Sequence, residues 1–277
     1  AKLKNLLSEM NPADIASVLD EVSANQRLLM FRLLAKEEAA ETFVELDSDN
    51  QESLIHAFSD TELKEVLDEL YVDDAVDIIE EMPANVVKRI LMHTDPVVRK
   101  SINEILKYPE DSAGSIMTIE YVDLKKYMTV DDAFTRIRRT GVDKETIYIC
   151  YVTDDNRKLL GLVTVKDLLL SDKSKKMFEI METNVISVTT LEDKEIVADK
   201  FQKYDLMAIP VVDQEERLVG IVTFDDAMDV LQDENTEDIE KMAAITPTDK
   251  PHLKMGIVET WKKRVPWLLL LMVSATF

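Results

Sequence analysis

A run of carboxylates near the C-terminal end carries the strongest chemical signal in this chain. Residues 225–240 contain eight Asp and Glu residues and neither Lys nor Arg. If this run is a helix, its carboxylates gather into groups, because residues three and four apart are neighbours on a helix surface. The two groups are Asp226, Asp229 and Asp233, and Glu234, Glu237 and Asp238. Like charges at this spacing repel one another, and a bound cation would relieve the repulsion; the alternative is a solvated acidic face.

The ligand types available indicate which cation would bind. Carboxylates, carbonyls and water suit Mg²⁺ or Ca²⁺ rather than zinc or copper. The three histidines, His56, His93 and His252, are scattered and form no zinc motif with the single cysteine. Because Mg²⁺ keeps several waters and takes one or two carboxylates, we expect its sites to be shared between domain surfaces.

Two Thr-x-x-Asp motifs suggest a second kind of chemistry, the binding of a nucleotide. The first motif runs from Thr164 to Asp167, and the second from Thr223 to Asp226. A carboxylate at this position can accept hydrogen bonds from both ribose hydroxyls. Lys166 in the first motif would meet a phosphate, whereas Asp225 in the second would repel one. The first motif is therefore a candidate adenine-nucleotide site, and a metal role is the better interpretation of the second.

Several functional classes are excluded by what the sequence lacks. The formal net charge is −22, whereas nucleic-acid-binding surfaces are basic, so we expect no nucleic-acid partner. No phosphate-binding glycine loop, dinucleotide fingerprint or nucleophile elbow occurs, which argues against an enzyme. One cysteine rules out a disulfide framework and fits a reducing compartment.

The elements that position these residues fall into regions of different periodicity. Residues 1–108 show apolar positions at three- and four-residue steps, which predicts helices throughout. Within them, residues 11–22 resemble residues 71–82 at an offset of 60. Repeated helix pairs stack into a solenoid with a shared core, so we expect an armadillo-like helical superhelix.

Residues 109–229 instead alternate short strands with helices, and they do so twice. The segment Lys158–Asp167 matches Arg217–Asp226 at an offset of 59, with a glycine at the same place in both. These glycines predict a turn or a close backbone approach. Thr129 and Thr190 each open a further Thr-x-x-Asp motif, whose hydroxyl we expect to cap a helix. The predicted architecture is therefore βαββα, repeated in tandem.

The remaining residues form two further segments. Residues 230–264 predict an acidic connecting helix and linker, which ends in the basic triplet 262–264. Residues 265–277 are largely apolar, as at the start of a transmembrane helix, and flanking basic residues mark the cytoplasmic side. The alternative interpretation of this segment is a buried core helix.

The tandem unit resembles a cystathionine-β-synthase (CBS) domain pair. Both copies carry the signature of that domain, which is a strand with the pattern Gly-hydrophobic-x-Thr, followed by x-x-Asp at the start of a helix. Together with the helical region, the segment Ala113–Met117, the acidic helix and the apolar end, the whole chain is similar to the cytosolic part of an MgtE-type magnesium transporter. The resemblance implies a homodimer in the cell membrane with this region on the cytoplasmic side. It also implies partnership with the protein's own transmembrane domain and regulatory Mg²⁺, with ATP as an additional cofactor.

The resemblance extends the set of expected magnesium ligands beyond the acidic helix. It carries that role to Asp73 and Asp77 in the helical region and to Glu195 and Asp205 in the second CBS copy, and Glu41 is a further candidate. The full expected set is Glu41, Asp73, Asp77, Glu195, Asp205, Asp226, Asp229, Glu234, Glu237 and Asp238.

The function this implies is sensing of cellular Mg²⁺, which compacts the domains and closes the pore. Two alternatives stay open. One is an adenine-nucleotide-sensing CBS module of another transporter, with Thr164, Lys166 and Asp167 at its site. The other is a helical scaffold that binds partner proteins.

Overall fold

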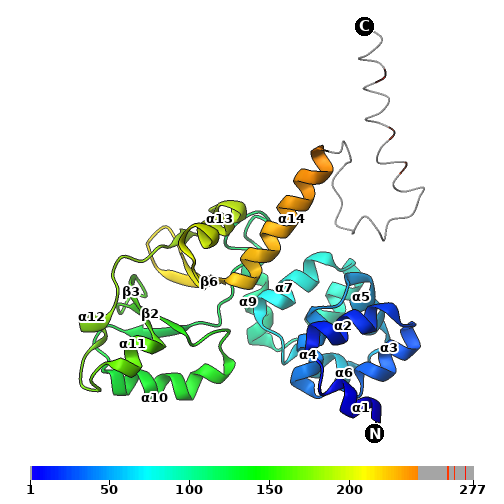
Figure 1. Cartoon of the computed structure of the whole chain (residues 1–277), viewed down its shortest axis with the longest axis horizontal. Coiled ribbons are helices and arrows are strands. Elements are labelled where there is room, and N and C mark those ends of the chain that lie inside the picture. The colour runs from blue at the N-terminus through cyan, green and yellow to red at the C-terminus, as the bar shows by residue number, and fades with distance from the viewer. Residues whose placement is uncertain (1, 243–260, 262–264, 266–271, 273–277) are drawn as a thin grey trace. The chain divides into compact units, whose positions relative to one another are not determined.

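The computed structural model describes residues 2–242 together with residues 261, 265 and 272 (Figure 1). By compactness the chain divides into two units, residues 1–192 with 209–222 and residues 193–208 with 223–277, and each is described by itself. The predicted start of a transmembrane helix at 265–277, and the predicted connecting segment beyond residue 242, lie almost wholly outside the described residues. Within the described part of the chain, no helix is both long and apolar enough to cross a membrane.

The first part of the larger unit consists of short helices separated by tight connections, as the apolar periodicity predicts (Figure 1). The repeat is confirmed: α2 spans Pro12–Glu21 and α7 spans Val72–Glu81, so both bounds differ by 60 residues. The other helices are α1 (Lys2–Leu7), α3 (Ala24–Phe31), α4 (Lys36–Val44), α5 (Ser48–Ala57), α6 (Asp60–Leu67), α8 (Ala84–His93) and α9 (Pro96–Ile105).

These helices stack in the manner of a solenoid, in which each packs on the helix two places along the chain. Helix α2 contacts α4, α4 contacts α6, and α6 contacts α8, while α3 contacts α5 and α7 contacts α9. The apolar faces of the stack bury residues such as Ile15, Leu19, Phe43 and Leu63 completely. Since each short helix buries its face only against neighbours, the stack is stable as a whole rather than helix by helix.

Arginine side chains close several helix C-termini in this stack. Arg27 is buried and donates from Nε to the carbonyl oxygen of Leu19 at 2.9 Å and from Nη2 to that of Val22 at 3.1 Å. Arg89 donates in the same way to the carbonyl oxygen of Phe58 at 2.7 Å. The last carbonyls of a helix have no intrahelical donor, so these guanidinium groups satisfy acceptors that would otherwise be buried and unpaired.

The rest of the described chain confirms the prediction of two βαββα copies. The first copy forms a sheet in the order β1-β2-β3 and the second a sheet in the order β4-β5-β6. Strand β1 pairs parallel with β2, β2 pairs antiparallel with β3, and β4 pairs parallel with β5. The first copy comprises β1 (Val122–Lys125), α10 (Val130–Thr140), the 3₁₀ turn η1 (Gly141–Asp143), β2 (Ile149–Thr153), β3 (Leu159–Thr164), α11 (Val165–Leu170) and α12 (Met177–Ile180). The second comprises β4 (Val188–Thr189), α13 (Lys194–Tyr204), β5 (Ala208–Val212), β6 (Leu218–Thr223) and α14 (Phe224–Met242).

The hairpin turns of the two copies are equivalent and pair with each other inside the larger unit. Arg157 and Glu216, which lie 59 residues apart, both adopt the left-handed conformation, with φ of 68° and 62°. The backbone N–H of Leu159 donates to the carbonyl of Glu216 at 3.0 Å, and that of Leu218 donates to the carbonyl of Arg157 at 2.9 Å. Backbone hydrogen bonds at the turns therefore connect the two copies.

The equivalent glycines serve a close backbone approach and not a turn. Gly161 and Gly220 lie within β3 and β6, and neither has a positive φ. A Cβ at Gly161 would lie 2.5 Å from the carbonyl oxygen of Glu182, and one at Gly220 would lie 2.8 Å from that of Thr118. Each glycine lets a further backbone segment pair with its strand.

One predicted helix cap is wrong. Thr129 caps α10 as expected, and its hydroxyl accepts from the backbone N–H of Asp132 at 3.2 Å. In the second copy, Asp193 is the N-cap of α13 and accepts from the backbone N–H of Glu195 at 2.9 Å, so Thr190 does not cap that helix. The physical reason is a turn in which the N–H of Glu192 donates to the carbonyl of residue 189, which delays the helix start.

Candidate functional site

Helices α13 and α14 pack against each other and carry most of the carboxylates expected to bind metal. Their contact is apolar at the base: Val197 and Ala198 of α13 and Ala227 of α14 are fully buried, and the rings of Phe201 and Phe224 lie 6.4 Å apart. This packing fixes the backbone of α14 from its first turn. The acidic side chains along both helices are therefore held on a defined scaffold.

Asp226 lies in the first turn of α14 in a half-buried position. Its Oδ2 accepts a hydrogen bond from the Thr223 hydroxyl and another from the Thr223 backbone N–H at 3.3 Å. Burial, with the nearby Asp225 and Asp229 carboxylates, raises the pKa of Asp226 to about 6, although the Thr223 hydrogen bonds oppose the change. Its negative charge is therefore poorly compensated by the protein itself.

Glu234 lies two turns further along α14 and faces the start of α13. Burial is the largest cause that raises the pKa of Glu234, followed by the charges of Glu195 on α13 and Glu237 on α14. The charges of nearby lysines act in the opposite direction, and one of them, Lys241, pairs with Glu237 at 2.6 Å. The two helices therefore hold Glu195 and Glu234 close enough to repel.

The remaining expected ligands of the smaller unit are dispersed. Asp229 and Asp238 are exposed on α14, and Glu195 is exposed in the first turn of α13. Asp205 ends α13 as its C-cap in the left-handed conformation, with φ of 52°. An aspartate tolerates that conformation better than most residues, so Asp205 also has a structural role.

The expected ligands of the helical region occupy three different environments. Asp73 is buried in the first turn of α7, with 6% of its surface exposed, whereas Asp77 one turn later is exposed. Glu41 is exposed on α4. Within the part of the chain that the structure describes, no group of three or more Asp, Glu, His or Cys side chains could hold a metal ion. A magnesium site shared between separate surfaces therefore stays a prediction.

The first Thr-x-x-Asp motif forms a capping box at the start of α11. The Thr164 hydroxyl donates to Asp167 Oδ2 at 2.5 Å, and the Thr164 backbone N–H donates to the same oxygen at 3.0 Å. Lys166 is exposed beside them. The carboxylate thus has a local structural role through one oxygen, which sequence reasoning did not anticipate.

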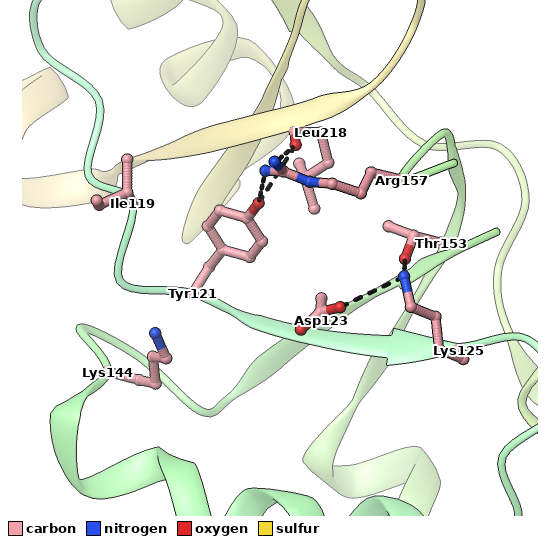
Figure 2. Close-up of a pocket in the computed structure, with 8 residues that line it drawn as sticks. All are labelled: Ile119, Tyr121, Asp123, Lys125, Lys144, Thr153, Arg157 and Leu218. Carbon is pink, nitrogen blue, oxygen red and sulfur yellow. Dashed lines mark hydrogen bonds and ion pairs between the residues drawn. The ribbon is translucent and has the colours of Figure 1, made fainter. Parts of the chain in front are cut away.

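A cavity of about 320 Å³ beside β1 was not anticipated from the sequence (Figure 2). It is lined by Ile119, Tyr121, Asp123, Lys125, Lys144, Thr153, Arg157 and Leu218. These residues come from four separate segments and form no sequence motif. The sequence gives only a weak signal for this cavity, because its three basic residues, Lys125, Lys144 and Arg157, are widely spaced along an otherwise acidic chain.

Comparison with known proteins assigns the chain to a family. Residues 10–111 match the model of the MgtE intracellular N domain, and residues 113–173 and 177–233 each match the CBS domain. One similar solved structure is the crystal structure of the cytosolic domain of the Mg²⁺ channel MgtE in complex with ATP. Its sequence is 37% identical to this chain, and the TM-score is 0.78. The match covers 82% of this chain and 93% of that one. The chain belongs to the MgtE family.

Other members of the MgtE family agree in sequence and structure. The magnesium transporter MgtE of Thermus thermophilus is 38% identical over 98% of this chain, and that of Bacillus subtilis is 31% identical over 97%. The soluble part of a magnesium transporter is 29% identical with a TM-score of 0.77, covering 83% of this chain and 91% of that structure. This chain spans 61% and 59% of the length of the two curated relatives. These relatives are transporters, and the family to which the chain belongs is a non-enzymatic one.

Proposed function

We propose that this chain is the magnesium-sensing regulatory region of a magnesium transporter in the cell membrane. The supporting observation is the raised pKa of Asp226 and Glu234 on α14, to which the neighbouring carboxylates contribute. Carboxylates that repel each other at neutral pH are stabilised by a divalent cation between them, and oxygen ligands suit Mg²⁺. Family membership supplies the independent support.

The proposed organisation follows the predicted boundaries. A helical domain (1–108) and a CBS pair (109–229) precede a connecting segment (230–264) and the start of a transmembrane helix (265–277). The proposed assembly is a homodimer attached to its own transmembrane domain, with this region on the cytoplasmic side. The proposed ligands are Glu41, Asp73, Asp77, Glu195, Asp205, Asp226, Asp229, Glu234, Glu237 and Asp238.

The magnitudes require several weak sites that act together. Two carboxylates about 6 Å apart repel by roughly 3 kcal/mol at an effective dielectric constant near 20. At about 20 mM Mg²⁺, a site with a Kd of about 1 mM stabilises the bound state by only about 2 kcal/mol, whereas a switch from 1:99 to 99:1 needs about 5.5 kcal/mol. One weak site is therefore insufficient. Several sites that fill together would draw acidic surfaces into a compact arrangement, close the pore and give a steep response to cellular Mg²⁺.

Small-angle scattering at constant ionic strength tests the proposal. The radius of gyration is measured from chelator to about 20 mM MgCl₂, a range set by millimolar sites. The test variant carries D226N, D229N, E234Q and E237Q. Its matched control carries four Glu→Gln changes at exposed positions of the helical region, Glu9, Glu21, Glu45 and Glu69.

We expect the wild type and the control to compact with Mg²⁺ and the test variant to lose that response. Compaction that persists in the test variant, or its absence in the wild type, would overturn the proposal.

A second candidate function is sensing of an adenine nucleotide at Thr164, Lys166 and Asp167. Its support is the similar MgtE structure that was determined in complex with ATP. The same samples titrated with ATP in place of MgCl₂ decide between the candidates. If ATP alone raises the melting temperature, and K166A abolishes that rise, the nucleotide is the main signal and Mg²⁺ is not.

A further inference from the structure

The cavity beside β1 has the opposite charge to the rest of the chain. Its lining includes three cationic side chains and one carboxylate, whereas the whole protein has a formal net charge of −22. None of its lining residues belongs to the Thr164 motif or to α14. Acidic surroundings normally repel anions, so a cationic cavity in such a protein calls for a separate explanation.

Part of this positive charge is compensated within the protein. Lys125 Nζ donates to the Thr153 hydroxyl at 2.9 Å and lies 3.6 Å from Asp123 Oδ2, as Figure 2 shows. Asp123 in turn pairs with Arg136, which does not line the cavity. Lys125 therefore contributes to the wall of the cavity and is not available as its main cationic ligand.

Arg157 and Lys144 have N–H donors that form no hydrogen bond with the described residues. Arg157 Nη2 donates to the Tyr121 hydroxyl at 3.2 Å and to the Leu218 carbonyl oxygen at 3.0 Å. Among the described residues, its Nε and Nη1 groups and the Lys144 ammonium group make no hydrogen bond or ion pair. Figure 2 shows these two side chains entering from separate segments of the chain, with Tyr121 between them in the view.

The backbone supports this placement of Arg157. A φ of 68° is uncommon for a residue other than glycine, and it occurs where the two hairpin turns pair. Its guanidinium contacts Leu218 of the second CBS copy from the turn of the first copy. A ligand bound to this guanidinium would therefore also stabilise the junction between the paired turns.

We propose that this cavity binds a small phosphate-bearing anion, with Lys144 and Arg157 as its principal ligands. A guanidinium group presents paired donors that match phosphate oxygens, and an ammonium group adds a compact point charge. A volume of about 320 Å³ lies at the small end of ligand pockets, which suits a diphosphate or sugar phosphate rather than a larger molecule.

Calorimetric titration with inorganic pyrophosphate in Mg²⁺-free buffer tests the site independently of the proposed cation response. Two variants remove the ligands. In K144Q, no recorded internal contact is lost, and in R157G, glycine accepts the positive φ while the guanidinium is removed. K158Q, on the same hairpin but outside the cavity lining, and K166A, at the other candidate anion site, are the matched controls.

We expect K144Q and R157G each to weaken pyrophosphate binding about tenfold or more, the loss of one charge-assisted hydrogen bond. K158Q and K166A should bind as the wild type does. The proposal is overturned if the wild type does not bind, if K144Q binds normally, or if K166A removes binding. Because K144Q breaks no recorded contact, a folding defect in R157G would not obscure the result.

Discussion

The helical region and the α13–α14 pair differ in how their carboxylates are surrounded. In the helical region carboxylates pair with cationic side chains, whereas in the α13–α14 pair they lie near other carboxylates. In the helical region, Glu62 contacts Arg32 at 2.6 Å and also accepts from Ser59; the side-chain hydrogen bond from Arg32 is the main reason that the pKa of Glu62 falls to about 2. On α14, burial and neighbouring carboxylates raise the pKa of Asp226 to about 6.

The comparison shows that the acidic excess of this chain is not uniform. Asp60 pairs with Arg89 at 3.1 Å and Asp68 with Lys64 at 2.7 Å, so the helical stack compensates these charges internally. In the α13–α14 pair, Glu195 raises the pKa of Glu234 across the two helices. The second arrangement leaves electrostatic repulsion that a cation from solution can remove.

The largest expected effect comes from breaking the internal compensation at Arg89. R89A leaves the carbonyls of Ile55 and Phe58 without this donor and removes the arginine that pairs with Asp60, which also lies near His93. We expect the free energy of unfolding to fall by about 2 to 3 kcal/mol, since two partly buried acceptors lose their donor. Urea denaturation measures it.

The matched control for that change is R139A, which truncates an exposed arginine of α10. Surface changes of this kind usually stay within about 0.5 kcal/mol. If R89A were no more destabilising than R139A, the helical region would not depend on its arginine contacts. The proposed difference in charge compensation between this region and α14 would then be wrong.

A smaller effect of opposite sign is expected at Asp226. D226N keeps an acceptor for Thr223 but removes the charge, so at pH 7 without divalent ions we expect a gain of about 1 to 2 kcal/mol. The folded-state pKa of about 6 lies above the unfolded value of about 3.9. The wild type should therefore gain stability as pH falls from about 6 to 4, and the advantage of D226N should vanish over that window.

Thermal unfolding of both proteins between about pH 4 and 7 checks this expectation. A D226N variant that is less stable than the wild type at pH 7 would show that the charge is compensated in the folded state. Asp226 would then not differ from the compensated carboxylates of the helical region.

The sequence was most informative where a pattern repeats along the chain. The offset of 60 residues predicted α2 and α7, and the offset of 59 predicted two equivalent CBS copies, because local spacing alone determines both. The cap at Asp193 was missed because a preceding turn shifts the helix start. Such a turn depends on how neighbouring segments meet, which single-sequence spacing does not encode.

The candidate sites were predictable only in part. The acidic character of α14 is evident in the sequence, but the approach of Glu195 to Glu234 depends on how α13 packs on α14. The burial of Asp73 likewise comes from the stacking of the helical region. The cationic cavity was not predicted, since Arg157 and Lys144 line the same cavity only after separate segments fold together.

The most direct measurement is a carboxyl-detected NMR titration of Asp226 and Glu234 with and without saturating MgCl₂. If a divalent cation relieves repulsion on α14, the pKa of Asp226 should start near 6 and fall toward its ordinary value when Mg²⁺ is present, and that of Glu234 should fall with it. Titration curves that coincide with and without Mg²⁺ would contradict a role for these carboxylates in sensing the ion.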